Sequence, residues 1–235
     1  MYINIYLKFI FIFYIGCTFG WILELCFNRI VYGKWINPGF LIGPYLPIYG
    51  FGLVILTVVF FMFHESTLPT FIIILLMGFL MTLIELVGGL LCLKSHVRLW
   101  DYSGYWGNYK GLICPLFSLI WTLMSALYYY ILAPNVVRAL DWFGRNLAFS
   151  YTLGVFTGFI IIDLIYSTKV YIKIKDYAKD NNITVKYEQF KMNIKDVQMK
   201  RKEKYSFLNP FKQTRPLKEY LSDYKKTKVH SKKCK

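Results

Sequence analysis

Five apolar stretches, each long enough to cross a lipid bilayer, dominate the sequence. They run from Tyr6 to Val31, Leu41 to Phe63, Pro69 to Leu93, Leu112 to Ala133 and Leu147 to Thr168. A helix needs roughly 20 largely apolar residues to span a hydrocarbon core about 30 Å thick. Hydrophobic residues make up 56% of the chain and aromatic residues 20%, more than a soluble domain requires. The sequence therefore predicts an all-α integral membrane protein with about five transmembrane helices.

Positive charge is concentrated after the fifth stretch. Residues 169–235 carry 20 Lys and Arg against 7 Asp and Glu, a net charge of +13, whereas residues 1–168 carry only +2. We therefore expect a transmembrane domain over 1–168 and a basic cytoplasmic tail over 169–235, with some helix between about 171 and 204. Lysines beside a membrane are attracted to anionic lipids, so lipid is the expected partner of the tail. No nucleic-acid-binding module is recognisable, and nucleic acid is not expected.

The distribution of Lys and Arg among the loops predicts the orientation, because cytoplasmic loops carry an excess of both. The basic residues after the first and third stretches are Arg29, Lys34, Lys94, Arg98 and Lys110. The opposite side has Lys8, the loop 64–68, and a loop with Arg138, Asp141 and Arg145. We expect the N-terminus outside and the C-terminus in the cytoplasm. Frequent Lys, Ile, Asn, Tyr and Phe are typical of an AT-rich bacterial genome, which makes the plasma membrane the expected location.

A short pattern, W-x-N-x3-L-I-x-P, occurs twice at an offset of 71 residues. Its two copies are Trp35, Asn37, Leu41, Ile42 and Pro44, and Trp106, Asn108, Leu112, Ile113 and Pro115. Matches of Leu and Ile arise easily by chance in an apolar chain, whereas matches of Trp, Asn and Pro do not. The pattern predicts two parallel halves, about 6–66 and 69–134, with a fifth helix over about 147–168 appended.

Three acidic residues, Glu24, Glu85 and Asp163, lie inside the apolar stretches at similar distances from the cytoplasmic boundary. A charged side chain there is costly and requires a partner or water. Two stripes at helical spacing accompany the glutamates: Gly16, Gly20, Glu24 and Asn28, and Gly78, Thr82, Glu85 and Gly89. Small residues on such stripes allow helices to approach closely. With Asn28 and Asp101 as further members, these acids either form a pocket for a cation, an amine or protons, or each simply pairs with a neighbour.

Two of the segments between the apolar stretches have an unusual composition. Residues 33–52 contain Pro38, Pro44 and Pro47, which lack backbone donors, so an uninterrupted helix is not expected. The segment is either a broken helix lining a cavity or a kinked entry anchored at the interface by Trp35 and Tyr45. The aromatic loop 99–111 should lie against headgroups or fold over the acidic residues.

The five cysteines and three histidines are scattered, without a metal-binding or disulfide spacing. We therefore expect no metal and no cofactor. Catalytic residues cannot be named from the sequence.

Several motifs give the chain a family resemblance over about residues 10–135. They are Gly20-Trp-x-x-Glu24, Asn37-Pro-Gly-Phe-Leu-Ile-Gly-Pro-Tyr-Leu-Pro-Ile-Tyr-Gly-Phe-Gly52, Leu99-Trp-Asp-Tyr-Ser103 and Gly111-Leu-Ile-Cys-Pro-Leu-Phe-Ser-Leu-Ile-Trp121. In these the chain resembles the ABC-transporter permeases of type IV, a CmpB-like group of bacterial integral membrane proteins. The resemblance implies a permease that works with a separate ATPase subunit. The chain itself has no G-x-x-x-x-G-K-[ST] phosphate loop.

Three functions are compatible with these features. The leading hypothesis is a transporter or permease subunit with a polar site near the cytoplasmic leaflet. A second is a membrane enzyme in which Glu24, Glu85 and Asp101 act on lipid headgroups, since acid–base catalysis needs a carboxylate within reach of the reacting group. A third is a scaffold or regulator that works through its tail. Homo-oligomerisation, the substrate and the energy source stay open.

Overall fold

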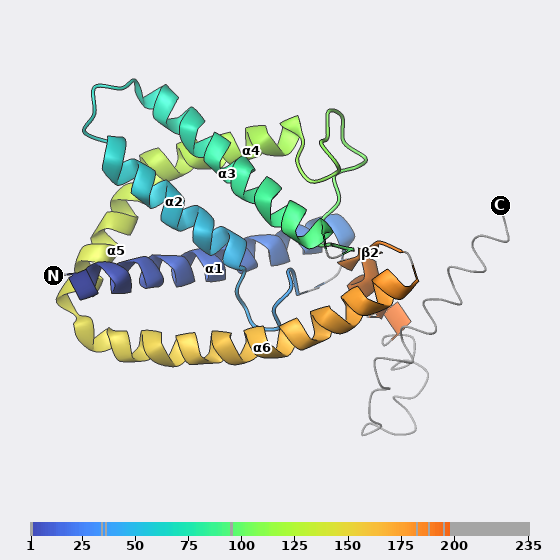
Figure 1. The fold of residues 1–235 in the computed structure, drawn as a ribbon. Helices are drawn as coiled ribbons and strands as arrows, with labels where there is room; N and C mark the ends of the chain where they lie inside the picture. The colour runs from blue at the N-terminus through green and yellow to red at the C-terminus, as the bar shows by residue number, and fades with distance from the viewer. Residues whose placement is uncertain are drawn as a thin grey trace. The chain divides into compact units, whose positions relative to one another are not determined.

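The computed structural model describes residues 2–33, 35, 37–94, 96–181, 183–187, 189–194, 196 and 197. The helices are α1 (Tyr2–Tyr32), α2 (Pro47–Phe63), α3 (Thr70–Leu93), α4 (Pro115–Leu127), the π-helix η1 (Tyr128–Leu132), α5 (Ala133–Arg145), the 3-10 helix η2 (Leu147–Phe149) and α6 (Ser150–Asp180) (Figure 1). Two short strands, β1 (Val97–Arg98) and β2 (Val185–Lys186), pair in parallel.

The chain divides into two compact units, Met1–Glu188 and Gln189–Lys235. In the second unit, residues 189–194, 196 and 197 are helical. The remainder of the expected tail helix, from residue 198 to residue 204, lies outside the described residues, as does Lys34.

Four helical segments of the described residues are long and apolar enough to cross a membrane: Ile5–Val31, Thr70–Leu93, Pro115–Arg145 and Leu147–Asp180. They coincide with the first, third, fourth and fifth predicted stretches. Helix α2 is apolar but has only 17 residues, a length of about 25 Å at 1.5 Å per residue. The membrane character of the chain is thus clear, whereas the count of five spans stays a prediction.

Helix α2 begins at Pro47, six residues later than the predicted start of the second stretch at Leu41. Residues 37–46 are not helical, because Pro38 and Pro44 cannot donate the backbone hydrogen bonds that a helix interior needs. Pro47 occupies the first turn of α2, where the missing donor costs nothing. The proline pattern therefore delays the helix rather than kinking it.

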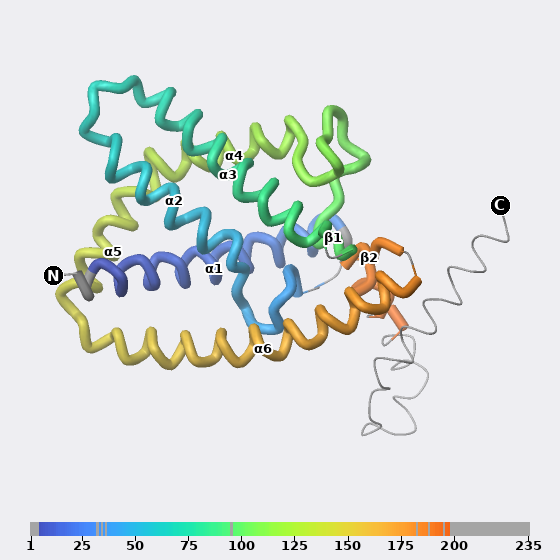
Figure 2. The backbone as a smooth tube through the Cα atoms, in the orientation of Figure 1, coloured from blue at the N-terminus to red at the C-terminus, as the bar shows by residue number. Residues whose placement is uncertain are grey.

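The prediction of a fourth loop is wrong. The segment that carries Arg138, Asp141 and Arg145 is part of helix α5. Helix α4 continues through η1 into α5, and the chain turns between α4 and α5 (Figure 2). The reason is an apolar stripe on α5, where Leu140 and Phe143 are buried and Phe143 stacks on Phe11 of α1 with ring centroids 4.6 Å apart. A charged helix with one apolar face is stabilised by such packing.

Helix α6 also extends beyond its predicted end at Thr168. It continues to Asp180, and the chain then returns to place β2 beside β1. Val97 pairs with Val185 and Arg98 with Lys186. The first part of the basic segment is therefore packed within the first unit, at the same end of the unit as the α3–α4 loop.

Glycines allow close contact within two helix pairs, α1–α2 and α3–α4, as the small-residue stripes predicted. A Cβ at Gly20 would lie 2.2 Å from Cγ of Tyr49, and a Cβ at Gly78 would lie 2.4 Å from Oγ1 of Thr122. In α6, by contrast, an added Cβ at Gly154 or Gly158 would meet no atom of another described element within 4 Å. The two helix pairs thus form the tightly packed part of the unit.

Candidate functional site

Glu85 of α3 is the most enclosed carboxylate of the described chain, with 5% of its surface exposed. Both of its oxygens accept hydrogen bonds from aromatic side chains. The Tyr102 hydroxyl donates to Oε1 at 2.8 Å, and the Trp121 indole Nε1 donates to Oε2 at 3.0 Å. Burial and the adjacent Glu85 carboxylate raise the pKa of Tyr102, so its hydroxyl stays a donor at neutral pH.

Glu24 of α1 accepts a hydrogen bond from the Tyr49 hydroxyl of α2, at 2.9 Å from Oε1. The position follows from the stripe on α1. Because Gly20 lies against the ring of Tyr49, the next residue on that face, Glu24, faces the hydroxyl end of the same side chain. Within the described residues no hydrogen bond to Glu24 Oε2 is formed, which leaves that oxygen available.

Tyr49 and Trp121 connect the two glutamates, because each donates a hydrogen bond to one glutamate and their rings lie against each other. Their ring centroids are 5.7 Å apart with the planes inclined at 57°. A continuous series of contacts therefore joins the two helix pairs, and we call it the polar site: Glu24, Tyr49, Trp121, Glu85 and Tyr102. No Lys, Arg or His of the described chain lies within 4.0 Å of either carboxylate.

Asp163 of α6 takes part in a different cluster. Its carboxylate accepts hydrogen bonds from the backbone amides of Ile42 and Gly43, at 3.1 and 2.8 Å, and from the hydroxyls of Tyr45 and Ser167, at 2.6 and 2.8 Å. These donors satisfy the charge, and they attach the non-helical segment 37–46 to α6. The contacts of the described residues do not link Asp163 to Glu24 or Glu85; for Asp163 they favour the second of the two alternatives, in which each acid pairs with its neighbours.

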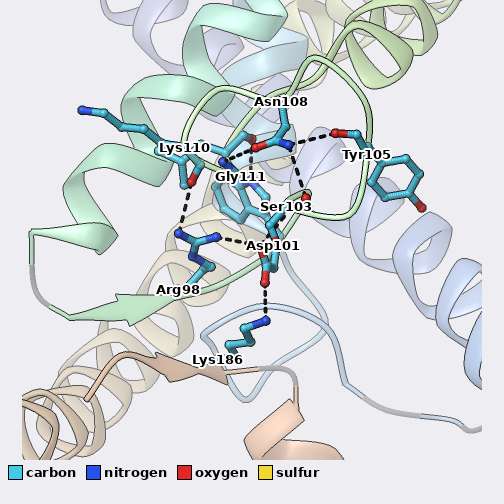
Figure 3. A network of polar contacts seen from close by, with 10 residues as sticks. Arg98, Asp101, Ser103, Tyr105, Asn108, Lys110, Gly111 and Lys186 are labelled. Atoms are coloured by element: carbon cyan, nitrogen blue, oxygen red, sulfur yellow. Dashed lines mark hydrogen bonds and ion pairs between the residues drawn. The ribbon is translucent and has the colours of Figure 1, made fainter. Parts of the chain in front are cut away.

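Asp101 also lies apart from the buried glutamates. Its carboxylate contacts Arg98 Nη1 at 2.6 Å and Lys186 Nζ at 2.5 Å (Figure 3). Burial by itself would raise the pKa of Asp101, but the Lys186 ion pair, two hydrogen bonds from Ser103 and the Arg98 contact together lower it below its ordinary value of 3.8. Asp101 is therefore ionised above that pH, and it loses its charge only in stronger acid. An Asp101 that is ionised at neutral pH does not suit the acid–base role considered from the sequence.

Asn28 is 4% exposed and follows Glu24 by one helical turn on α1. Asn37, which belongs to the first copy of the repeated motif, accepts a hydrogen bond from Trp21 Nε1. Its side-chain amide donates hydrogen bonds to the carbonyls of Leu41 and Ile42. Asn108 donates to the carbonyls of Ser103 and Tyr105 and accepts from the amide of Gly111. Both asparagines shape their loops rather than the polar site.

The tryptophans and prolines of the motif differ between its copies. Trp35 is 55% exposed and stacks with Arg29, whereas Trp106 is 87% exposed. Pro44 precedes α2 by three residues, and Pro115 begins α4. In both predicted halves, however, a glutamate of the first helix binds an aromatic donor of the second. Duplication stays a prediction, supported by this correspondence.

Tyr49, Tyr102 and Trp121 were not predicted as site residues. All three lie within the motifs that carry the family resemblance, but nothing in their local pattern distinguishes them from the many other aromatic residues of the chain. Tyr102 and Trp121 lie 17 and 36 residues after Glu85, so their convergence depends on tertiary packing. Only the unusual presence of a glutamate in an apolar helix signals that such donors must exist.

Residues 11–168 match a protein family described as "putative ABC-transporter type IV". The matched region includes the apolar part of α6, which the motif resemblance over residues 10–135 had left out. Neither the curated proteins nor the solved structures include a match to the chain.

Proposed function

Since the chain belongs to the family described as "putative ABC-transporter type IV", we propose that it is the membrane-spanning subunit of a transporter and that the polar site binds a positively charged species. Its long apolar helices make it a multi-pass membrane protein. The observation that carries the proposal is the pair of glutamates, held between two helix pairs by neutral donors alone.

The negative charge of the two glutamates determines which kind of ligand the polar site can bind. A carboxylate inside a membrane protein costs several kcal/mol unless it is paired or protonated, and the described chain supplies no cationic partner. A proton or a cationic group such as a protonated amine would remove that cost. Glu24 is less enclosed than Glu85 and retains an oxygen without a hydrogen bond, so an arriving cation would meet Glu24 first.

The proposed orientation places the polar site near the cytoplasmic leaflet. The α3–α4 loop and the segment after α6 meet through β1 and β2, and both are basic, as cytoplasmic segments typically are. In this orientation the N-terminus lies outside, and the tail faces anionic lipid headgroups.

Energy would come from a separate ATPase subunit, because the chain has no phosphate loop of its own. The test is purification from native membranes in a mild detergent. We expect a protein with a phosphate loop to accompany the chain at fixed stoichiometry, and the complex to hydrolyse ATP. Glu85→Gln should lower the hydrolysis rate by about tenfold, equivalent to about 1.4 kcal/mol in the barrier.

Glu65→Gln is the matched control, because the Glu65 side chain is 87% exposed and lies outside the polar site; its ATPase rate should equal that of the unmodified complex. A chain that purifies alone in a stable form, without ATPase activity, would refute the proposed coupling. Equal rates for both variants would refute the role of the polar site.

A further inference from the structure

The segment after α6 reaches the loop that covers the polar site. Parallel pairing of β2 with β1 brings Lys186 opposite Arg98, and the Lys186 ammonium contacts Asp101 Oδ2 at 2.5 Å. Figure 3 shows Arg98 and Lys186 approaching Asp101 from the two strands. We call these three residues the Asp101 cluster. In this cluster, the ion pair between Lys186 and Asp101 attaches the basic segment to the α3–α4 loop.

The Asp101 cluster sets the shape of the α3–α4 loop. Asp101 Oδ1 accepts a hydrogen bond from the Ser103 amide at 3.1 Å, and Arg98 donates to the Lys110 carbonyl at 3.1 Å. Gly111, at φ +67°, leaves the space that the cluster needs, since a Cβ there would lie 2.4 Å from Arg98 Nη1. The two ends of the loop are thus tied to the same pair of charged side chains.

Tyr102 follows Asp101 directly, and its position depends on the same loop. Its amide donates to the Gly111 carbonyl at 2.9 Å, its ring stacks on Phe117 with centroids 4.2 Å apart, and its hydroxyl reaches Glu85. Displacing the backbone at Asp101 would therefore displace the donor that covers one oxygen of Glu85.

We infer that the basic segment after α6 controls access to the polar site: while Lys186 holds Asp101, Tyr102 covers Glu85, and when Lys186 leaves, the Glu85 carboxylate is uncovered. Asp101 and Lys186 are positioning residues, since neither contacts Glu85. The inference rests on the proposed function only in taking Glu85 as part of the transport site. Lys186 is suited to a reversible contact because its side chain is 45% exposed, and the ion pair of such a side chain is weak enough to open.

The test measures how readily Glu85 reacts with dicyclohexylcarbodiimide, a reagent that modifies protonated carboxyl groups in apolar surroundings. The full-length chain is labelled in detergent, and the Glu85 peptide is quantified by mass spectrometry. Tyr102→Phe removes the covering hydroxyl and defines the uncovered state. Lys186→Met should raise labelling of Glu85 about two- to fivefold, the change in an equilibrium that loss of one partly exposed ion pair produces.

Two matched variants separate the ion pair from general effects. Lys186→Arg retains the charge and should keep labelling close to that of the unmodified chain. Lys173→Met removes an exposed lysine of α6 outside the cluster and should also leave labelling unchanged. Unfolding of a variant would expose Glu24 as well, so labelling of the Glu24 peptide reports on folding.

Labelling of Glu85 that is unchanged in Lys186→Met would overturn the inference, as would equal increases in Lys186→Met and Lys173→Met. The measurement requires neither transport nor an ATPase subunit. Failure of the proposed function would therefore appear as a missing ATPase partner, whereas failure of the inference would appear as unchanged labelling.

Discussion

Glu85→Ala should lower the free energy of unfolding by about 3 kcal/mol, because it leaves two enclosed donors without an acceptor at a typical cost of about 1–3 kcal/mol each. The donors are the Tyr102 hydroxyl and the Trp121 indole, and they come from two different elements, so the loss loosens both the α3–α4 loop and the contact of α3 with α4. Truncation also leaves a cavity, which adds to the cost. The measurement is unfolding in mixed micelles with increasing SDS, followed by tryptophan fluorescence.

The matched control for this substitution is Glu65→Ala. It removes a carboxylate whose side chain is 87% exposed, and it should change the free energy of unfolding by less than about 0.5 kcal/mol. Glu85→Gln should lie between the two, because its amide oxygen accepts from one donor while its NH₂ group cannot accept from the other. A Glu85→Ala variant as stable as the control would mean that the two aromatic hydrogen bonds do not hold the site together.

Gly20→Val should lower the free energy of unfolding about as much as Glu85→Ala does, but through steric overlap rather than loss of hydrogen bonds. An added Cβ would lie 2.2 Å from Cγ and 2.3 Å from Cβ of Tyr49, and these atoms are too close to the backbone of α2 to rotate away. The two helices must separate, which breaks the contacts of Tyr49 with Glu24 and Trp121. We expect a loss of roughly 3 kcal/mol, at the upper end of the usual cost of overpacking.

Gly158→Val provides the control for Gly20→Val. It introduces the same side chain at a glycine of α6 where nothing lies within 4 Å of an added Cβ in the described chain. Both glycines are helical, so the change in helix propensity is the same, and only the packing differs. The same unfolding measurement should show little change for Gly158→Val. Equal losses for the two variants would contradict the close approach of α1 and α2.

The sequence predicted those features of the fold that depend on local composition. Apolar length located four of the helices, and the glycine stripes identified the faces along which α1 meets α2 and α3 meets α4. The prolines indicated that the helix of the second stretch would be interrupted, but not that it would begin only at Pro47. Helix α5 was missed because its charged residues, Arg138, Asp141 and Arg145, resemble a loop when length and hydropathy are the criteria, whereas its apolar residues recur on one helical face.

The candidate site was predicted less completely, for a physical reason. A glutamate in an apolar helix reveals that it requires donors, but the donors can come from any element that packs beside it. Asp163 illustrates the difficulty. Its residue count to the predicted cytoplasmic boundary is similar to that of Glu24 and Glu85. Its partners nevertheless include the amides of Ile42 and Gly43 besides two hydroxyl groups, and backbone groups leave no trace in a sequence pattern. The depth of a residue in the membrane can be estimated by counting along its helix. The partner toward which its side chain points cannot be found in this way.

A double-mutant cycle on the free energy of unfolding tests most directly whether Glu24 and Glu85 belong to one site. Glu24→Gln, Glu85→Gln and the double variant are compared in the same mixed micelles, with Glu65→Gln and Glu85→Gln as the control pair. Residues of one network should deviate from additivity by at least about 0.5 kcal/mol, whereas independent sites add within about 0.3–0.5 kcal/mol. We predict a clear deviation for Glu24 with Glu85 and additivity for Glu65 with Glu85. Additivity in both pairs would show that the two glutamates act separately.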